Sequence, residues 1–99
     1  ISMFVITLTY KKPLADVELH LAAHIDYLDA YYAKGVFIAS GRKVPRTGGV
    51  IFAKAESRAV LEAILQQDPF YTEDVAEFDV VEFVPTKAAA GFEQLIETL

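Results

Sequence analysis

The spacing of apolar residues alternates between two periods along this chain, and that alternation limits the folds open to it. Strand patterns, rich in β-branched and aromatic residues or alternating apolar with acidic ones, occupy residues 3–10, 36–40, 50–53 and 77–84. Helical spacing separates the first strand from the second, and the third from the fourth. The chain therefore predicts the order strand, helix, strand, strand, helix, strand.

Three- and four-residue steps mark the two helical segments. The first is predicted over residues 14–34, and Gly35 follows it as a typical C-terminal glycine. Its apolar positions are Leu14, Val17, Leu21, Ile25, Leu28 and Tyr32. The second is predicted to begin after Ser57, a good N-cap, and to end at Asp68, because a residue before proline disfavours the helical conformation.

This element order is the split β-α-β arrangement of ferredoxin-like domains, an α+β fold with both helices on one face of a four-stranded antiparallel sheet. Residues 88–99 add a short C-terminal helix, with Phe92, Leu95, Ile96 and Leu99 on its apolar side. The first two strands are apolar on both sides, so the sheet face away from the helices needs a cover. We expect a homodimer or higher homo-oligomer in which two sheets face each other.

Length and composition limit the classes of protein and partner. We expect one domain over residues 3–99, with residues 1–2 as a remnant of the expression vector. A net charge of −5 argues against a nucleic-acid partner, and no run approaches the roughly 18 apolar residues of a membrane span. The absence of cysteine excludes disulfides, thiolate catalysis and zinc–sulfur sites, and fits a cytoplasmic protein.

His24 and Asp68 are the first candidates for chemistry. His24 lies on or beside the apolar stripe of the first helix, where imidazole can act as a general base or acid. The alternative is a core histidine bonded to a backbone carbonyl. Asp68 lies where the second helix ends, and a carboxylate facing His24 would fix the tautomer of its ring. The alternative is that Asp68 only organises the turn before Pro69.

The connection over residues 40–49 is the third candidate site, because it combines glycines with basic side chains. Glycine lets backbone N–H groups approach a ligand closely. Arg42 or Arg46 can hold a carboxylate through two parallel hydrogen bonds. The alternative is a solvated hairpin loop whose charges only improve solubility.

Two further clusters on the first helix carry weaker signals. His20 and His24 are one turn apart, but Leu21 stands where a zinc motif normally has glutamate, so no metal site is predicted. Tyr27 and Tyr31 are expected to form a subunit contact or surface pair rather than a cofactor site. The chain has no dinucleotide, phosphate-loop or redox-cofactor motif, and no cofactor is predicted.

Taken together, these motifs resemble the YCII-related domain family over essentially the whole chain. The residues that carry the resemblance are the strand from Met3 to Leu8, His24, Lys34-Gly35, Ala39-Ser40-Gly41 and Asp68-Pro69-Phe70-Tyr71. The runs Arg46-Thr47-Gly48-Gly49 and Gly91-Phe92-Glu93 resemble one branch of the family. The resemblance implies a dimeric α/β barrel with an open cleft in each subunit. It also implies an active site formed by a histidine and an aspartate, which match His24 and Asp68.

The leading hypothesis is a small enzyme, a lyase or isomerase, that acts on a small cyclic or anionic metabolite. His24 and Asp68 would carry general acid/base chemistry, and Ser40, Gly41, Arg42 and Arg46 would bind the substrate. Gly41-Arg42 stands where the family commonly has Gly-Pro, which changes the expected mouth of the cleft. The alternatives are a non-catalytic module for small-molecule binding or assembly, and a cofactor-free oxygenase suggested by fold analogy alone.

Overall fold

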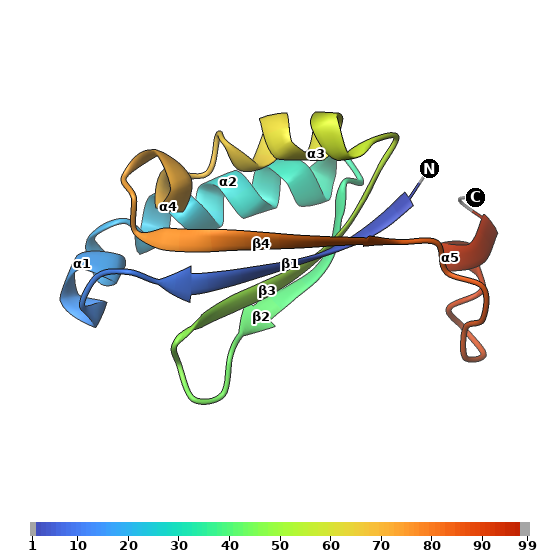
Figure 1. Cartoon of the computed structure of the whole chain (residues 1–99), viewed down its shortest axis with the longest axis horizontal. Helices are drawn as coiled ribbons and strands as arrows, with labels where there is room; N and C mark the ends of the chain where they lie inside the picture. The colour runs from blue at the N-terminus through green and yellow to red at the C-terminus, as the bar shows by residue number, and fades with distance from the viewer. Residues whose placement is uncertain (1, 98–99) are drawn as a thin grey trace.

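Four antiparallel strands form one sheet in the computed structural model, which describes residues 2–97 (Figure 1). The strands are β1 (Ser2–Tyr10), β2 (Phe37–Arg42), β3 (Gly48–Ala55) and β4 (Ala76–Phe83), in the spatial order β2-β3-β1-β4. The apolar β1 is central, and its Ile6 lies opposite Ile51 of β3 and Val80 of β4. The predicted α+β class and antiparallel sheet are therefore confirmed.

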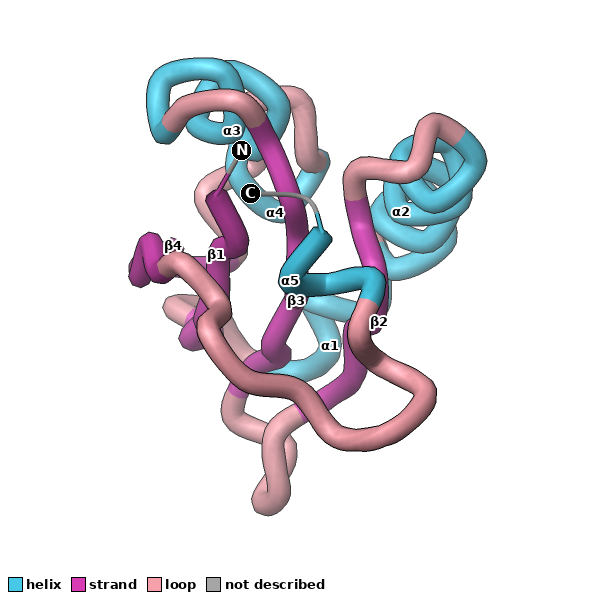
Figure 2. The backbone as a smooth tube through the Cα atoms, turned by 90° about the vertical axis from the view of Figure 1, so that its right-hand side faces the viewer, coloured by secondary structure: helices cyan, strands magenta, loops and turns pink. Residues whose placement is uncertain are grey.

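Three helices cover one face of this sheet (Figures 1 and 2): α2 (Leu21–Ala33), α3 (Arg58–Leu65) and α4 (Pro69–Thr72). α1 (Leu14–Leu19) precedes α2, and the single turn α5 (Gln94–Glu97) lies near the C-terminus. The core fills the space between the helices and the sheet, with buried side chains that include Phe4, Ile6, Leu8, Val17, Phe37, Ile51, Leu61, Leu65 and Phe70.

The first helical segment is interrupted, so the prediction of one helix over residues 14–34 is wrong. His20 separates α1 from α2 with φ −107° and ψ 2°, and its N–H donates to the carbonyl of Val17, a three-residue step that closes α1. The interruption changes which positions face the core. Val17 and His24 are buried, whereas Leu14 and Ile25 of the predicted stripe are exposed.

Tyr27 and Tyr31 pack inward, so the prediction of a surface pair or subunit contact is wrong. Tyr31 is buried and its hydroxyl donates to Gln67 Oε1 at 2.6 Å. Tyr27 packs against the core and donates to the carbonyl of Ile64 at 2.8 Å. Because each hydroxyl has a partner, the rings can be buried without an unpaired polar group. Burial, and the nearby charge of Asp68, raise the pKa of Tyr27, so its hydroxyl stays a donor.

The strands of the central hairpin run further than the sequence predicts. Gly41 and Arg42 extend β2 beyond the predicted end at Ser40, and β3 already begins at Gly48. At Gly48 a Cβ atom would lie 1.7 Å from the carbonyl oxygen of Leu8, so only glycine lets β3 approach β1 here. Ser40, Gly41 and Arg42 are therefore held by the sheet, whereas Arg46 lies in the loop between β2 and β3.

The ends of the later elements agree with the sequence to different degrees. Ser57 caps α3 as predicted, because its hydroxyl accepts the N–H of Val60 at 3.2 Å. The predicted C-terminal helix is reduced to Gln94–Glu97, after Gly91 with a left-handed φ of 95°. Leu99 of that prediction lies outside the described residues. Within residues 2–97, no helix is long and apolar enough to cross a membrane.

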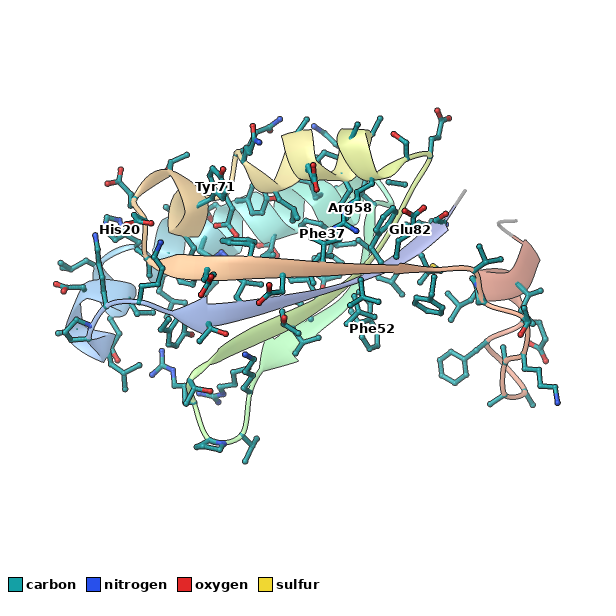
Figure 3. The ribbon with its side chains drawn as sticks, viewed as in Figure 1. His20, Phe37, Phe52, Arg58, Tyr71 and Glu82 are labelled. Atoms are coloured by element: carbon teal, nitrogen blue, oxygen red, sulfur yellow. The ribbon has the colours of Figure 1, made fainter. Side chains whose placement is uncertain are left out.

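The sheet face opposite the helices carries an apolar strip. Phe52 of β3 and Val81 of β4 both lie opposite Val5 of β1, so their side chains share this face. Figure 3 shows Phe52 on the side of the sheet away from the helices. Phe52 is 44% exposed, Val81 60% and Phe83 42%. We name Val5, Phe52, Val81 and Phe83 the open-face strip.

One exposed ion pair joins the end of β1 to the turn after α4. The ammonium of Lys11 donates to the carboxylate of Asp74, and this hydrogen bond lowers the pKa of Asp74 from 3.8 and raises that of Lys11 from 10.5. Since the folded pKa of Asp74 is lowered, the pair stabilises the fold above the unfolded value of 3.8. That contribution is lost as the pH falls through the folded value.

We expect the substitution Lys11→Met to return the pKa of Asp74 most of the way to its ordinary value, because the largest cause of the shift is removed. An NMR titration of the side-chain carboxyl carbon measures this directly. Lys34→Met, which removes a lysine elsewhere on the surface, is the control and should leave the Asp74 titration unchanged. An equal Asp74 titration in wild type and Lys11→Met would contradict the pairing.

Candidate active site

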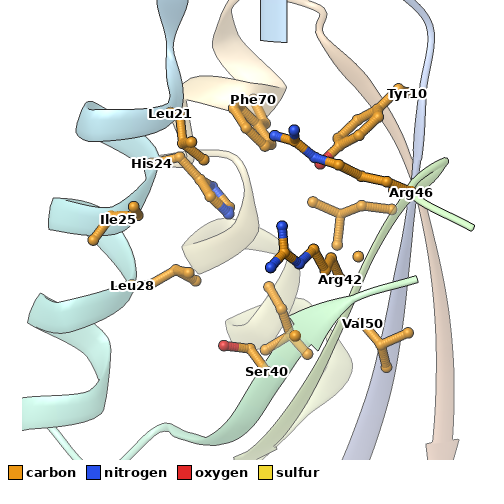
Figure 4. Close-up of a pocket in the computed structure, with 15 residues that line it drawn as sticks. Tyr10, Leu21, His24, Ile25, Leu28, Ser40, Arg42, Arg46, Val50 and Phe70 are labelled. Carbon is orange, nitrogen blue, oxygen red and sulfur yellow. The ribbon is translucent and has the colours of Figure 1, made fainter. Parts of the chain in front are cut away.

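A cleft of about 270 Å³ opens between α2 and the strands β2 and β3 (Figure 4). Most of its wall consists of leucine, isoleucine, valine and aromatic side chains from α2, the sheet and α4. Its polar members are His24, Ser40, Arg42 and Arg46, and Gly41, Gly48 and Gly49 contribute backbone. All but one of the predicted site residues thus line a single cleft, the exception being Asp68.

Asp68 lies behind His24 and reaches the cleft only through that residue. Asp68 is fully buried, and its Oδ1 lies 2.8 Å from Nδ1 of His24, whose exposed fraction is 8%. A carboxylate can only accept hydrogen bonds, so this contact places the imidazole proton on Nδ1. The other ring nitrogen, Nε2, then carries a lone pair. It has no hydrogen-bond partner among residues 2–97.

Phe70 fixes the plane of the imidazole and the position of the carboxylate. Its ring stacks on that of His24, with centroids 3.9 Å apart and an interplanar angle of 1°. Its backbone N–H donates to Oδ1 of Asp68 at 2.9 Å, which makes Asp68 the N-cap of α4. Asp68 therefore organises the turn and also bonds His24, so both interpretations of this residue describe real contacts.

Phe70 is a site residue that the sequence motifs did not identify, although a local signal for it is present. Asp68 and Pro69 form a cap and a first helical position, and the residue after them is the one whose N–H meets the cap. Tyr10 was also missed as a cleft residue. It lies on the same face of β1 as Leu8, as strand alternation requires, and both side chains line the cleft.

One oxygen of the buried carboxylate remains unpaired. Within the described part of the chain, Oδ2 of Asp68 has no hydrogen-bond partner, whereas Oδ1 accepts from both His24 and Phe70. An unpaired buried carboxylate oxygen costs free energy of folding. Toward the described residues, Asp68 therefore uses only one of its two carboxylate oxygens, and that oxygen accepts from His24 and from the backbone of α4.

The opposite wall of the cleft is cationic. The guanidinium groups of Arg42 and Arg46 face the imidazole of His24 across the cleft (Figure 4). Arg46 forms an ion pair with Glu18 at 3.5 Å, and no ion pair or hydrogen bond involves the Arg42 side chain among residues 2–97. Ser40 lies at the edge of this wall and shares a hydrogen bond of 2.6 Å with the hydroxyl of Tyr32.

His20 is not brought to this site. It ends α1 and does not line the cleft, and no group of three metal-ligating side chains converges anywhere in residues 2–97. The cleft therefore combines a histidine–carboxylate pair, an apolar wall and two arginines. This arrangement is suited to proton transfer on a small organic molecule.

Comparisons with known proteins agree with this fold. No curated protein matches the chain. Among solved structures, 5-chloro-2-hydroxyhydroquinone dehydrochlorinase from Burkholderia phenoliruptrix AC1100, in complex with 2,5-dihydroxybenzoquinone, is 21% identical, with a TM-score of 0.70. The match covers 82% of this chain and 92% of that one. At this identity the similarity shows a shared fold.

The family comparison covers every element of the cleft. The YCII-related domain profile matches residues 3–84, which include α2, the β2–β3 hairpin and the turn at Asp68. The resemblance seen in the sequence is confirmed, and the chain belongs to the YCII-related domain family.

Proposed function

We propose that this domain is a small enzyme that eliminates or isomerises a cyclic metabolite, with His24 as the general base and acid. The observation that carries the proposal is the hydrogen bond of 2.8 Å between His24 and the buried Asp68 at the wall of an open cleft. It leaves Nε2 as a free base with a fixed direction. A positioned base of this kind contributes about 10²–10⁴ in rate.

The proposed reaction begins with transfer of a proton from the substrate to Nε2 of His24. The electron pair left behind forms a double bond. In an elimination the leaving group on the neighbouring carbon departs with its own pair, and in an isomerisation the imidazolium returns the proton to another carbon. Asp68 stabilises the imidazolium, and the stacked ring of Phe70 keeps it aimed at the cleft.

The size and lining of the cleft favour a one-ring substrate. Its volume of about 270 Å³ is below the range of about 300–1,000 Å³ that is usual for drug-sized ligands. Apolar side chains such as Leu21, Ile25 and Leu28 would contact the faces of a ring and exclude water from the proton transfer. The named activity of the structural neighbour, dehydrochlorination of a hydroxylated ring, supports the same reaction class for this chain.

The test is chloride release from 5-chloro-2-hydroxyhydroquinone, assayed under anaerobic conditions with wild type, His24→Gln and His20→Gln. We expect turnover by wild type and a loss of at least about 100-fold in His24→Gln, because glutamine cannot accept the proton. His20→Gln is the matched control, since His20 lies one helical turn away and outside the cleft, and should keep full activity.

Each alternative has its own outcome in this assay. Full activity in His24→Gln would contradict the proposed base. Stabilisation of wild type by 2,5-dihydroxybenzoquinone without turnover of any ring substrate would favour a binding module, because ligand binding raises stability by mass action. Turnover seen only when the assay is repeated in air would favour a cofactor-free oxygenase.

We also propose that the chain forms a homodimer in which the open-face strip of one copy packs on that of another. Such a dimer would close the two sheets into an α/β barrel and leave each cleft on the helix side. Support comes from the large apolar side chains of Phe52, Val81 and Phe83, which are all substantially exposed on one sheet face. An isologous contact would bury the strip of both copies at once.

A further inference from the structure

The charge in the cleft is opposite to the charge of the protein. The chain has a net charge of −5, yet the charged side chains that line the cleft are Arg42 and Arg46, beside the titratable His24. Asp68, the acid behind His24, is buried, and its Oδ1 accepts from His24 and Phe70. A cationic pocket with low-dielectric walls in an acidic protein concentrates small anions.

The two arginines are not equivalent. Arg46 reaches Glu18 of α1 at 3.5 Å, so a carboxylate of the protein itself already offsets part of its charge. Arg42 has no such partner among the described residues, and its side chain is exposed toward the cleft. Arg42 lies opposite Gly49 on β3, so no neighbouring side chain on that strand crowds the guanidinium. Arg42 is therefore the cation that is free to bind a ligand.

We propose that Arg42 selects a ring carboxylate, a one-ring acid whose carboxylate binds the guanidinium while the ring lies against the apolar wall. The inference rests on the proposed function, because it names the substrate class of the same cleft. The guanidinium fork matches the two oxygens of a carboxylate and forms short, charge-assisted hydrogen bonds. A simple phenol, with a pKa of about 10, is neutral near pH 7 and supplies no charge for this contact.

The same contact would orient the substrate for the proposed chemistry. Arg42 is on β2 and His24 is on α2, and the two side chains point into the cleft from opposite walls (Figure 4). A ring held by its carboxylate at Arg42 presents its other carbons to Nε2 of His24. Arg42 thus acts as a specificity-determining residue, and His24 acts on the part of the ring that Arg42 does not hold.

The experiment compares the binding of benzoate with that of benzamide, a neutral probe of the same shape, by NMR titration at low ionic strength. We expect wild type to prefer benzoate, and Arg42→Gln to weaken benzoate binding by at least about tenfold while benzamide binding stays unchanged. Arg58→Gln is the matched control, because Arg58 is an exposed arginine on α3 that does not line the cleft. Added salt should reduce the preference of wild type.

Two further variants, Arg42→Lys and His24→Gln, test whether the guanidinium group of Arg42 itself selects benzoate. Arg42→Lys keeps the charge but loses the fork, so we expect a reduced preference for benzoate. His24→Gln should still prefer benzoate, because the proposed proton transfer and the anion contact use different groups. Chloride release from the neutral ring substrate can therefore fail or succeed independently of benzoate binding.

Several results would overturn the inference. Equal affinity of wild type for the two probes, or no binding of either, would remove the selection for a carboxylate. An unchanged preference in Arg42→Gln, or a loss confined to Arg46→Gln, would show that Arg42 is not the anion-binding residue. Thermal unfolding of each variant verifies that the fold is intact, and the exposure of Arg42 predicts little change.

Discussion

Replacing Asp68 with alanine will lower the free energy of unfolding by about 1–3 kcal/mol, the usual cost of leaving a buried hydrogen-bond donor without its acceptor. Oδ1 of Asp68 accepts from Nδ1 of His24 at 2.8 Å and from the N–H of Phe70 at 2.9 Å. Alanine would leave both donors without an acceptor in a site where all three residues are buried. The first turn of α4 would also lose its cap.

Urea unfolding followed by circular dichroism measures this change. Two further variants, Asp26→Ala and Asp68→Asn, serve as controls. Asp26→Ala removes an exposed aspartate from α2 and should leave the free energy of unfolding close to that of wild type. Asp68→Asn keeps an oxygen that can accept from both donors, so it should cost less than alanine while removing the negative charge. Equal stability of Asp68→Ala and Asp26→Ala would contradict the importance of the pair for the fold.

Asp68 illustrates which contacts can be predicted from the local sequence and which cannot. The turn before Pro69 is a local feature, and the alternative interpretation of Asp68, that it organises this turn, follows from local sequence alone. The contact with His24 joins residues 44 positions apart, and no spacing rule reaches that far. Residue types made the contact plausible, and the family resemblance singled it out. The stacking of Phe70 on His24 depends on the packing of α4 against α2, which no local pattern contains.

The element order was predictable for a simple physical reason. A strand alternates its side chains with a period of two and a helix with a period of 3.6, so the change of period along the chain marks each boundary. Local signals also placed single residues correctly: Ser57 caps α3, and Gly35 adopts the left-handed φ of 75° expected after a helix. These predictions needed only neighbours in the sequence.

The prediction of the first helix was wrong where the environment of a side chain depends on residues distant in the sequence. Ile25 and Leu28 of the predicted stripe line the cleft, where Ile25 is exposed and Leu28 also packs against the core. Tyr31 was predicted to lie on the surface or at a subunit contact because it is off the apolar stripe of the helix, yet its hydroxyl finds an acceptor in Gln67, 36 residues away, at 2.6 Å. Burial of a polar group depends on a partner that only the tertiary structure provides.

The second large effect is expected on dimer affinity, for the substitution Phe52→Asp. Phe52 lies in the open-face strip, and twofold symmetry would place the new carboxylate in the interface twice. Burying an unpaired charge opposite apolar side chains is costly, so the dimer should weaken by about 1,000-fold. At concentrations where wild type is dimeric, sedimentation equilibrium should find the variant as a monomer.

Val60→Asp is the control that separates an interface from general solubility. Val60 is 46% exposed, almost the same as the 44% of Phe52, but it lies on α3 and outside the strip. A dimer that survives Val60→Asp and dissociates in Phe52→Asp locates the contact on the sheet. A variant Phe52→Asp that remains dimeric, or a wild type that is monomeric throughout, would refute the proposed barrel. The proposed His24 chemistry is tested separately from the dimer, because His24 and Asp68 belong to the same chain and bond each other within it.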